Sequence, residues 1–573
     1  MILQPIVDIA QICAQKGVTN VVISPGSRSA ALTLAFARHP DIHTVVVADE
    51  RAAGFIALGM AQQTGMAVAL VCTSGSAAYN LAPAVVEAFF QEIPLLVFTA
   101  DRPKEWTGQQ DGQTMYQTEL YGKHVKKSFE LPADYIHTDS IWFTERTINE
   151  AINLAHGSPM GPVHINVPIR EPFYPTIDEK FEYSKQLKIV ERLDSQAVLN
   201  TETWHRLQAE WESAERIVVA VGQMKPNRSL MASLKSLSES MGVVVLGDVI
   251  GNVPNNEHFV TSHDVFLGSQ DAELLQKLQP DLLITIGNSF LSKNLKSFIR
   301  KYKPAKHWHV KQSDNLIDAF QTLTTVIAVS PNYFFDKLLN DLDYQQFVQN
   351  DSEDEERVDH QQLWLKTDRE AKRRLYDFIK NESRWNELAV IEKTTEKLPQ
   401  NIVLHLANSM AVRYVNLVGV PENTEIWANR GVSGIDGCTS TAVGAALKTD
   451  KMVFLITGDV AFFYDRNALW HNHLPKNLKI ILLNNAGGNI FRIIDGPSVQ
   501  PELEQYFETR HQTTAQRTAE DAQMGYFSMT EQSDFQVVWD NFIQNNNKSN
   551  LLEIFTNPVV NAEVFGDYKK AMR

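Results

Sequence analysis

The sequence has few cysteines, no long apolar run and no excess of positive charge. Its three cysteines, Cys13, Cys72 and Cys438, lie far apart and form neither a metal-binding pattern nor a disulfide framework, so a reducing cytoplasm is the expected location. No apolar run approaches the ~18 residues of a membrane span, and no signal-peptide pattern is seen. The net charge of −15 argues against a nucleic-acid-binding surface.

The length and the order of the segments indicate several α/β domains. A chain of 573 residues should hold about three domains. Short apolar runs alternate with helical stretches throughout, which is typical of parallel α/β sheets. We expect domains at 1–180, 195–345 and 375–573, with an acidic linker or solvated helix face over 341–362.

Residues 452–491 carry the strongest local pattern. MVFLIT and LKIILL are buried-strand patterns, and a helix is expected between them over 461–474. A βαβ crossover of this kind brings the ends of both strands to one edge of a sheet. Asp459 and Asn485 should therefore both lie at the carboxyl edge, where open α/β sheets bind ligands.

The residue types at these strand ends suit a magnesium ion. A carboxylate from Asp459, an amide oxygen from Asn485 and the carbonyl of Gly487 are hard oxygen ligands, and Mg²⁺ takes its other ligands from water and phosphate. An ordinary strand-end turn explains Gly458 and Asp459 taken alone. The combination with Asn485 and the following glycines favours a site that holds Mg²⁺ on a diphosphate.

In the first domain the residues alone leave two interpretations open. The turn Pro25–Ser29 precedes a helix, so its backbone N–H groups and Arg28 suit an anion, but a simple turn with a capping serine is equally compatible. Glu50 follows the strand HTVVVA, and by itself it is best explained as a first-turn helix charge.

The middle of the chain repeats the strand and helix alternation without a nucleotide-binding motif. It contains neither G-x-G-x-x-G nor a Walker A loop, so nucleotide binding is unsupported. His307 and His309 could form a metal pair, but alternate residues of a packed strand are the favoured interpretation. Lys293 is a candidate anion contact.

A series of sequence blocks occurs in the order found in one enzyme family. The blocks are SPGSRS, ADERAAGF, TSGSAAYN, TADRP, GPVHINVPIREP, ANSMAVR, ANRGVSGIDG and GD…NNAGGNIF. They resemble the 2-succinyl-5-enolpyruvyl-6-hydroxy-3-cyclohexene-1-carboxylate synthases, thiamine diphosphate-dependent enzymes of menaquinone synthesis. The resemblance covers both end domains well and the middle domain weakly.

This resemblance implies a fold, a cofactor and a set of cofactor contacts. The fold would comprise pyrimidine-binding, central and diphosphate-binding α/β domains with parallel sheets. The cofactors would be thiamine diphosphate and Mg²⁺ or Mn²⁺. Glu50 would accept a hydrogen bond from the aminopyrimidine ring, and Ile435 would wedge the cofactor into its bent form. The remaining cofactor and metal contacts would be Asp459, Asn485, Gly487, Phe491 and Ser409.

The reaction implied is decarboxylation of 2-oxoglutarate followed by 1,4-addition of the succinyl carbanion to isochorismate. Both substrates are dicarboxylates, so a chain of net negative charge needs local cations at the site. Glu50, Gln113 and Arg28 would be the catalytic residues. The substrate contacts would be Ser27, Arg28, Arg102, Gln113, Ser409, Arg413, Arg430 and Lys293.

The resemblance also implies a homodimer, or a dimer of dimers, with each active site between two subunits. The closest alternative is another thiamine diphosphate-dependent decarboxylase or carboligase, such as an acetohydroxyacid synthase-like enzyme with FAD in its middle domain. An α/β binding protein without catalytic activity is the alternative from a different class.

Overall fold

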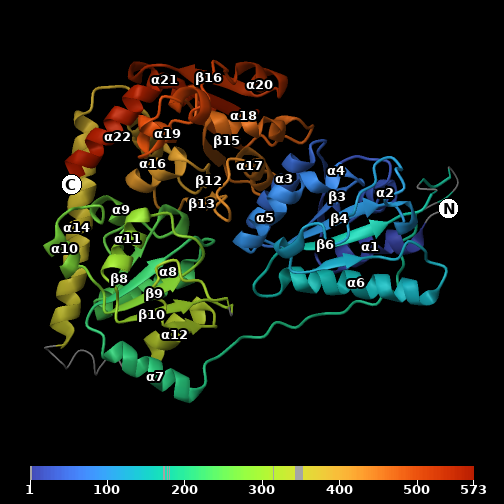
Figure 1. The fold of residues 1–573 in the computed structure, drawn as a ribbon, viewed down its shortest axis with the longest axis horizontal. Coiled ribbons are helices and arrows are strands. Elements are labelled where there is room, and N and C mark those ends of the chain that lie inside the picture. The colour runs from blue at the N-terminus through green and yellow to red at the C-terminus, as the bar shows by residue number, and fades with distance from the viewer. Residues whose placement is uncertain are drawn as a thin grey trace.

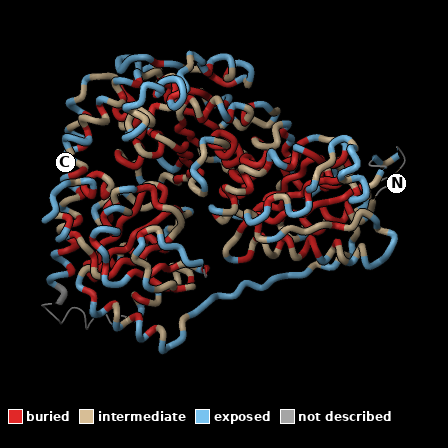
Figure 2. Tube along the Cα trace, viewed as in Figure 1, coloured by how far each residue is buried: buried red, intermediate tan, exposed pale blue. Residues whose placement is uncertain are grey.

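The structure is a computed structural model with three parallel β-sheets, each covered by helices (Figure 1). It describes residues 3–171, 174–176, 179, 181–313, 315–341 and 353–572, and side chains in the last range from residue 355. The chain runs from the first α/β unit through an extended segment, exposed in Figure 2, into the central unit and then the third. This architecture confirms the predicted fold class.

The first unit contains a six-stranded sheet in the order β2-β1-β3-β4-β6-β5, with all neighbouring strands parallel. Its strands are β1 (Asn20–Ile23), β2 (His43–Val46), β3 (Val68–Cys72), β4 (Leu95–Asp101), β5 (Ser128–Glu130) and β6 (Val163–Pro168). Its helices are α1 (Gln4–Gln15), α2 (Ala30–Ala37), α3 (Glu50–Thr64), α4 (Ser76–Asn80), α5 (Ala82–Gln91) and α6 (Thr138–His156).

The central unit contains a five-stranded parallel sheet in the order β11-β10-β9-β7-β8. Its strands are β7 (Ile217–Val221), β8 (Val244–Gly247), β9 (Leu282–Ile286), β10 (Lys306–Val310) and β11 (Thr325–Ile327). Its helices are α7 (Thr201–Glu212), α8 (Arg228–Met241), α9 (His263–Phe266), α10 (Ala272–Lys277), α11 (Lys293–Lys301) and α12 (Pro331–Asp341). The long helix α14 (Glu353–Asn381) leads to the third unit, so the part of the predicted 341–362 segment from Glu353 onward is helical, whereas residues 342–352 lie outside the described residues.

The third unit has a six-stranded parallel sheet in the order β13-β12-β14-β15-β17-β16. Its strands are β12 (Val403–Leu406), β13 (Glu425–Ala428), β14 (Val453–Gly458), β15 (Leu478–Asn484), β16 (Gly525–Met529) and β17 (Asn550–Phe555). Its helices are α15 (Glu387–Lys397), α16 (Met410–Val418), α17 (Cys438–Ala446), α18 (Asp459–Tyr464), α19 (Ile490–Ile493), α20 (Gln516–Asp521), α21 (Phe535–Gln544) and α22 (Pro558–Met572).

The helix predicted over 461–474 was wrong in extent. The α-helix ends at Tyr464 and is followed by one 3₁₀ turn, Arg466–Leu469. The cause lies at Asp465, whose buried carboxylate accepts hydrogen bonds from the backbone N–H and the hydroxyl of Ser440 at 2.7 and 2.8 Å. These tertiary bonds compete with continuation of the helix.

His307 and His309 are packed strand residues, as favoured from the sequence. Both imidazoles are buried in β10 and share the hydroxyl of Thr285, at 3.0 Å from Nε2 of His307 and 2.9 Å from Nδ1 of His309. Within the described ranges, no cluster of His, Cys, Asp and Glu side chains could hold a metal. The metal-pair interpretation is therefore unsupported.

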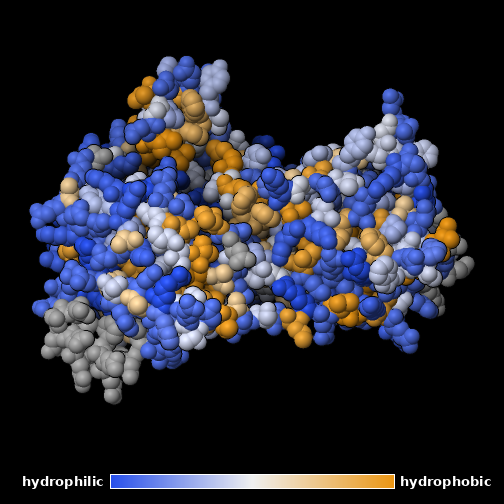
Figure 3. All heavy atoms as spheres, turned by 60° about the horizontal axis from the view of Figure 1, so that its bottom comes forward, coloured by the Kyte–Doolittle hydropathy of each residue, from blue (hydrophilic) through white to orange (hydrophobic). Residues whose placement is uncertain are grey.

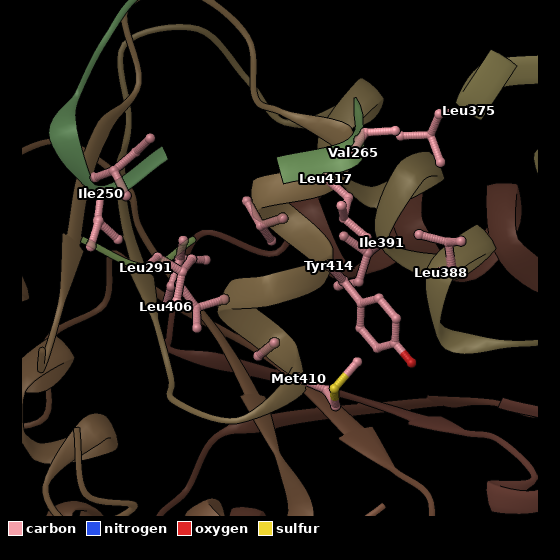
Figure 4. Close-up of a cluster of buried hydrophobic side chains, with 14 of the residues drawn as sticks. Ile250, Val265, Leu291, Leu375, Leu388, Ile391, Leu406, Met410, Tyr414 and Leu417 are labelled. Atoms are coloured by element: carbon pink, nitrogen blue, oxygen red, sulfur yellow. The ribbon is translucent and has the colours of Figure 1, made fainter. Parts of the chain in front are cut away.

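The hydrophobic cores join the units in pairs. One core runs from the central sheet into the third unit, where Met410, Tyr414 and Leu417 of α16 meet Ile250, Val265 and Leu291 (Figure 4). A second core joins the first and third units through α3 and α17, which pack so closely that a Cβ on Gly59 or Gly444 would overlap the backbone of the other helix. In the part of the chain that is described, no helix is both long and apolar enough to cross a membrane.

Candidate active site

The third sheet has a switch point in its strand order at the edge where the predicted metal ligands lie. Its strand order reverses between β12 and β14, and open α/β sheets bind ligands at such a switch point. Ser409 follows β12, whereas Gly458 and Asp459 follow β14. A Cβ added to Gly458 would meet no atom within 4 Å. The backbone just before Asp459 therefore borders open space.

The structure brings Asp459 and Gly487 together beside Asn485. Asp459 is 1% exposed, and its carboxylate accepts hydrogen bonds from the backbone N–H groups of Val460 at 2.7 Å and Gly487 at 2.9 Å. Gly487 has φ +156°, and a Cβ there would lie 2.7 Å from the carbonyl oxygen of Glu508. Only glycine fits this turn, which holds the Gly487 N–H on the carboxylate, while the Gly487 carbonyl accepts a hydrogen bond from the backbone N–H of Asn489 at 3.0 Å.

The amide of Asn485 is oriented for a cation. Its Nδ2 donates to Oε1 of Glu387 at 2.6 Å, whereas its buried Oδ1 has no hydrogen-bond partner among the described residues. A buried acceptor without a partner costs free energy, so this oxygen calls for a bound cation or donor. The oxygen donors of Asp459, Asn485 and Gly487 thus fit a hard divalent ion.

Sequence reasoning missed Glu387, which orients the Asn485 amide. Glu387 is fully buried at the start of α15, and burial raises its pKa to about 7, with the hydrogen bond from Asn485 opposing the rise. Thr556 also donates to its Oε1, at 3.4 Å. In the sequence Glu387 resembles an ordinary first-turn helix acid, so no local signal distinguished it.

Two further polar side chains lie near the same turn. His511 has its Nε2 3.4 Å from Oδ2 of Asp459. Asn489 is 3% exposed, and neither atom of its amide has a hydrogen-bond partner among the described residues. His511 lies in the polar stretch 497–523, which contains none of the site residues predicted from the sequence.

Glu50 lies at the carboxyl edge of the first sheet, close to the third unit. It is the first residue of α3, and its Oε2 accepts a hydrogen bond from Nδ2 of Asn80 at 3.2 Å. The residues on either side of it contact the segment that follows Asp459. Asp49 accepts a hydrogen bond from Asn467 at 2.7 Å, and Arg51 donates to the carbonyl of Tyr464 at 2.7 Å.

The first sheet also presents a pair of arginines at its carboxyl edge. Arg28 is 5% exposed and donates to the carbonyl of Ile169 at 3.0 Å. Burial lowers the pKa of Arg28, and the nearby charge of Arg102 lowers it further. Arg102 pairs with Asp111 at 2.9 Å and donates to the carbonyl of Gly112 at 3.0 Å, which fixes the loop that carries the exposed Gln113. Ser27, next to Arg28, is exposed.

A second pair of arginines lies at the edge of the third sheet. Arg413 donates to the carbonyl of Ser409, which has the strained φ of +73°, and Arg430 donates to Oδ1 of Asn408 at 2.9 Å. Burial lowers the pKa of Arg430, and the charge of Arg413 lowers it further. Two half-buried guanidinium groups whose charges repel each other favour a bound anion nearby.

Lys293 joins the Arg413 side of the site from the central unit. It opens α11 and lines, with Asn294, Met410 and Arg413, a cavity of about 380 Å³ between the central and third units. Asp264 lies in the same cavity and partly offsets the positive charge of Arg413. The structure therefore places Lys293 in the same cavity as Arg413, another of the predicted substrate contacts.

The predicted residues fall into two groups within one chain. Ser27, Gln113 and Glu50 in the first unit make no hydrogen bond or ion pair with the third-unit set in the ranges that the structure describes. The two apolar residues predicted to contact the cofactor are Ile435 and Phe491. Ile435 is 36% exposed, and the Phe491 ring packs near Phe507 with centroids 5.9 Å apart.

Comparison with known families defines the class. The family model "Thiamine pyrophosphate enzyme, N-terminal TPP binding domain" matches residues 7–124, and "Middle domain of thiamine pyrophosphate" matches residues 181–406. The chain is therefore a thiamine diphosphate enzyme in class.

Full-length relatives define the family within that class. Proteins named 2-succinyl-5-enolpyruvyl-6-hydroxy-3-cyclohexene-1-carboxylate synthase match from Cytophaga hutchinsonii (42% identical, 100% of this chain and 99% of the relative) and Flavobacterium johnsoniae (37%, 98% of each). The namesake from Bacteroides fragilis is 35% identical over 96% of each chain. The chain belongs to the 2-succinyl-5-enolpyruvyl-6-hydroxy-3-cyclohexene-1-carboxylate synthase family.

Proposed function

We propose that this protein decarboxylates 2-oxoglutarate and adds the resulting four-carbon unit to isochorismate, as a synthase of menaquinone biosynthesis. The observation that carries the proposal is the Oδ1 of Asn485, unpartnered among the described residues, beside the buried carboxylate of Asp459. Two pairs of arginines support it, one at the edge of the first sheet and one at the edge of the third. The unpartnered amide oxygen and the buried carboxylate favour a cation that carries a diphosphate. The arginines favour substrates with carboxylate groups. We also propose the domain limits 1–180, 195–345 and 375–573, within which all three sheets lie.

The cofactor would be held from both sheets. Asp459, Asn485 and the carbonyl of Gly487 would bind Mg²⁺ or Mn²⁺ on the diphosphate, with Glu387 holding the Asn485 amide in the required orientation. Thiamine diphosphate, when bound, supplies a thiazolium ring that accepts the electron pair released as a 2-oxo acid loses CO₂. Glu50 would hold a proton between its carboxylate and the aminopyrimidine ring.

The apolar and polar residues around the cofactor would have separate tasks. Ile435 would pack between the two rings of the cofactor, and Phe491 would line the pocket and exclude water. Ser409 and Gln113 would donate neutral hydrogen bonds to cofactor or substrate oxygens. The strained φ of +73° at Ser409 is the kind of backbone outlier that clusters at such sites.

The arginines would recognise the substrate carboxylates. A chain with a net charge of −15 repels dicarboxylates at long range, so it needs local cations where they bind. Arg28 and Arg102, with Ser27 beside them, would bind one carboxylate group, and Arg413, Arg430 and Lys293 would bind another. Guanidinium groups bind carboxylates with two parallel hydrogen bonds, which orients the substrate as well as holding it.

We propose that the active protein is a homodimer or a dimer of dimers, with Glu50 and the metal ligands contributed by different subunits. Exposed apolar side chains near the site support this: Ile435 is 36%, Val432 47% and Tyr79 56% exposed. A partner subunit would cover such surface. Figure 3 shows apolar side chains gathered beside a hollow between two lobes of one face.

The proposal is tested with purified protein, Mg²⁺, thiamine diphosphate, 2-oxoglutarate and isochorismate. Loss of isochorismate is followed by ultraviolet absorbance, and each component is omitted in turn. We expect loss only when all components are present, together with one CO₂ per isochorismate consumed. CO₂ release from pyruvate without any loss of isochorismate would instead identify a different thiamine diphosphate-dependent decarboxylase or carboligase.

A further inference from the structure

A buried carboxylate, Glu87, joins the first unit to the loop that carries Arg430 and Ile435. Glu87 lies on α5 and is 1% exposed. Its Oε1 accepts a hydrogen bond from the backbone N–H of Gly431 at 2.7 Å, and its Oε2 accepts one from Val432 at 2.8 Å. Two consecutive backbone donors therefore converge on one carboxylate from a different unit.

The same loop is held from the central unit. Gln223 donates to the carbonyl of Ala428 at 2.8 Å, and the hydroxyl of Ser289 donates to the carbonyl of Arg430 at 3.2 Å. On the first-unit side, Gln91 donates to Oε1 of Glu87 at 2.5 Å. The loop after β13 is thus fixed by polar contacts from both other units, at the point where they meet.

The fit between Glu87 and the loop depends on Gly431. A Cβ at this position would lie 2.7 Å from the carbonyl oxygen of Glu87 and 3.1 Å from its carboxylate. Real Cβ atoms are not found this close to backbone oxygen, so a side chain at residue 431 would push the loop away from α5. Close approach of the loop backbone, rather than loop flexibility, explains the glycine.

The chemistry of the contact requires an acceptor-only group. A buried carboxylate is costly unless its oxygens are hydrogen-bonded. Burial raises the pKa of Glu87, and the hydrogen bonds from Val432 and Gly431 oppose the rise. An amide of the same shape would turn one acceptor oxygen into an N–H donor that faces another N–H.

We propose that Glu87 is a positioning residue, which holds Gly431 and Val432 so that Arg430 faces the substrate carboxylate and Ile435 faces the cofactor. The inference rests on the proposed function, because Arg430 and Ile435 take their roles from it. It adds that α5 of the first unit determines the position of the loop that the third unit of the same chain contributes to the site. Glu87 touches neither substrate nor cofactor and acts only through the loop.

The test compares Glu87→Gln with Glu92→Gln in the full-length protein. Glu92 caps the same helix but pairs with Lys311 of the central unit at 2.6 Å, so the control removes the same charge from a side chain that forms no hydrogen bond with the loop among the described residues. We expect Glu87→Gln to raise the KM of one dicarboxylate substrate and the dissociation constant of thiamine diphosphate by ~10-fold each, the usual effect of losing a charge-assisted hydrogen bond. Glu92→Gln should change neither.

Two readouts do not depend on turnover. Cofactor binding is titrated by tryptophan fluorescence in the presence of Mg²⁺, and trypsin cleavage after Arg430 is timed well below the melting temperature. Both should report a loosened loop in Glu87→Gln only. If the wild-type protein fails to consume isochorismate, the proposed function falls, but these two measurements still decide whether Glu87 holds the loop.

Gly431→Ala provides an independent variant in case Glu87→Gln does not fold. Its added Cβ should displace the loop and reproduce the same pattern of raised KM, weakened cofactor binding and faster cleavage. Wild-type values in both variants would overturn the proposal, and so would an equal loss in Glu92→Gln.

Discussion

The first and third units have the same strand order but carry different chemistry at equivalent strand ends. If the six strands of each unit are numbered in sequence order, both sheets have the order 2-1-3-4-6-5, so the second strand lies at one edge. Glu50 follows this edge strand in the first unit, whereas Asn429 and Arg430 follow it in the third. The shared topology therefore determines where these strand-end side chains lie. The residue at each position determines whether it can bind an aminopyrimidine ring, a metal ion or a carboxylate.

The switch points of the sheets differ in how open they are. In the third sheet Gly458 faces open space. In the central sheet a Cβ on Gly287 would lie 2.7 Å from the carbonyl oxygen of Gly222, so the loops after β7 and β9 close the crevice against each other. In the first sheet Gly26 packs directly against Thr73. Of these three glycines only Gly458 borders open space, which supports placing the diphosphate of the proposed site at the third sheet.

The largest effect is expected from Asp459→Asn, which changes the metal site proposed for the third unit. Loss of the metal-binding charge should weaken Mg²⁺-dependent cofactor binding by ~10³-fold, because several kcal/mol of electrostatic stabilisation depend on the ion. Isothermal titration with thiamine diphosphate measures it. Asp450→Asn, an exposed carboxylate just before β14, is the control and should bind normally. Unchanged cofactor affinity in Asp459→Asn would remove Asp459 from the metal site.

Glu50→Gln should impair the proton transfer proposed for the first unit and leave metal binding by the third unit intact. We expect kcat to fall ~10²–10³-fold, the usual contribution of a positioned proton-transfer group, while Mg²⁺ affinity and the melting temperature stay near wild type. The fall in kcat is measured by steady-state kinetics at saturating cofactor. Near-normal turnover would show that Glu50 is an ordinary first-turn helix acid.

Arginine variants should distinguish the first unit from the third, because each unit contributes one pair of arginines. Arg413→Ala should raise the KM of one dicarboxylate ~10–100-fold, since a charge-assisted hydrogen bond contributes ~1.5–3 kcal/mol. Arg102→Ala should mainly affect a different carboxylate. Initial rates with each substrate varied in turn separate the two, and a KM that changes for neither substrate would exclude the residue concerned.

The smallest effect is expected from Glu387→Ala. Without its acceptor the Asn485 amide can rotate, and we expect Mg²⁺ affinity to fall ~10-fold, as for other residues that orient a metal ligand. Competition between Mg²⁺ and a fluorescent chelator measures this affinity. Glu392→Gln, on the same helix but half-exposed, should have wild-type affinity. Equal affinities in both variants would contradict the role of Glu387.

The sequence predicted the strand ends well because they depend on local patterns. The spacing of Asp459 and Asn485 follows from one βαβ unit, and the structure places both residues directly after the neighbouring parallel strands β14 and β15. Glu50 required the family resemblance, because a helix-start acid has no distinctive local pattern. The end of α18 was misjudged because Asp465 bonds to Ser440, 25 positions away.

The supporting residues could not be predicted because their partners are distant in sequence. Glu387 lies 98 positions from Asn485, and Glu87 lies 344 positions from Gly431. Each looks like an ordinary helix residue until the packing of whole units brings it to the site. Tertiary contacts of this kind leave no periodicity or spacing to detect.

In the proposed dimer, Glu50 of one subunit and Asp459 of the other serve the same cofactor. This arrangement is tested by unfolding and refolding an equimolar mixture of Glu50→Gln and Asp459→Asn proteins, each inactive alone. In a mixed dimer one site carries both substitutions and the other carries none, so random assembly should restore about a quarter of wild-type activity. A refolded mixture that contains mixed dimers yet stays inactive would contradict a site shared between subunits.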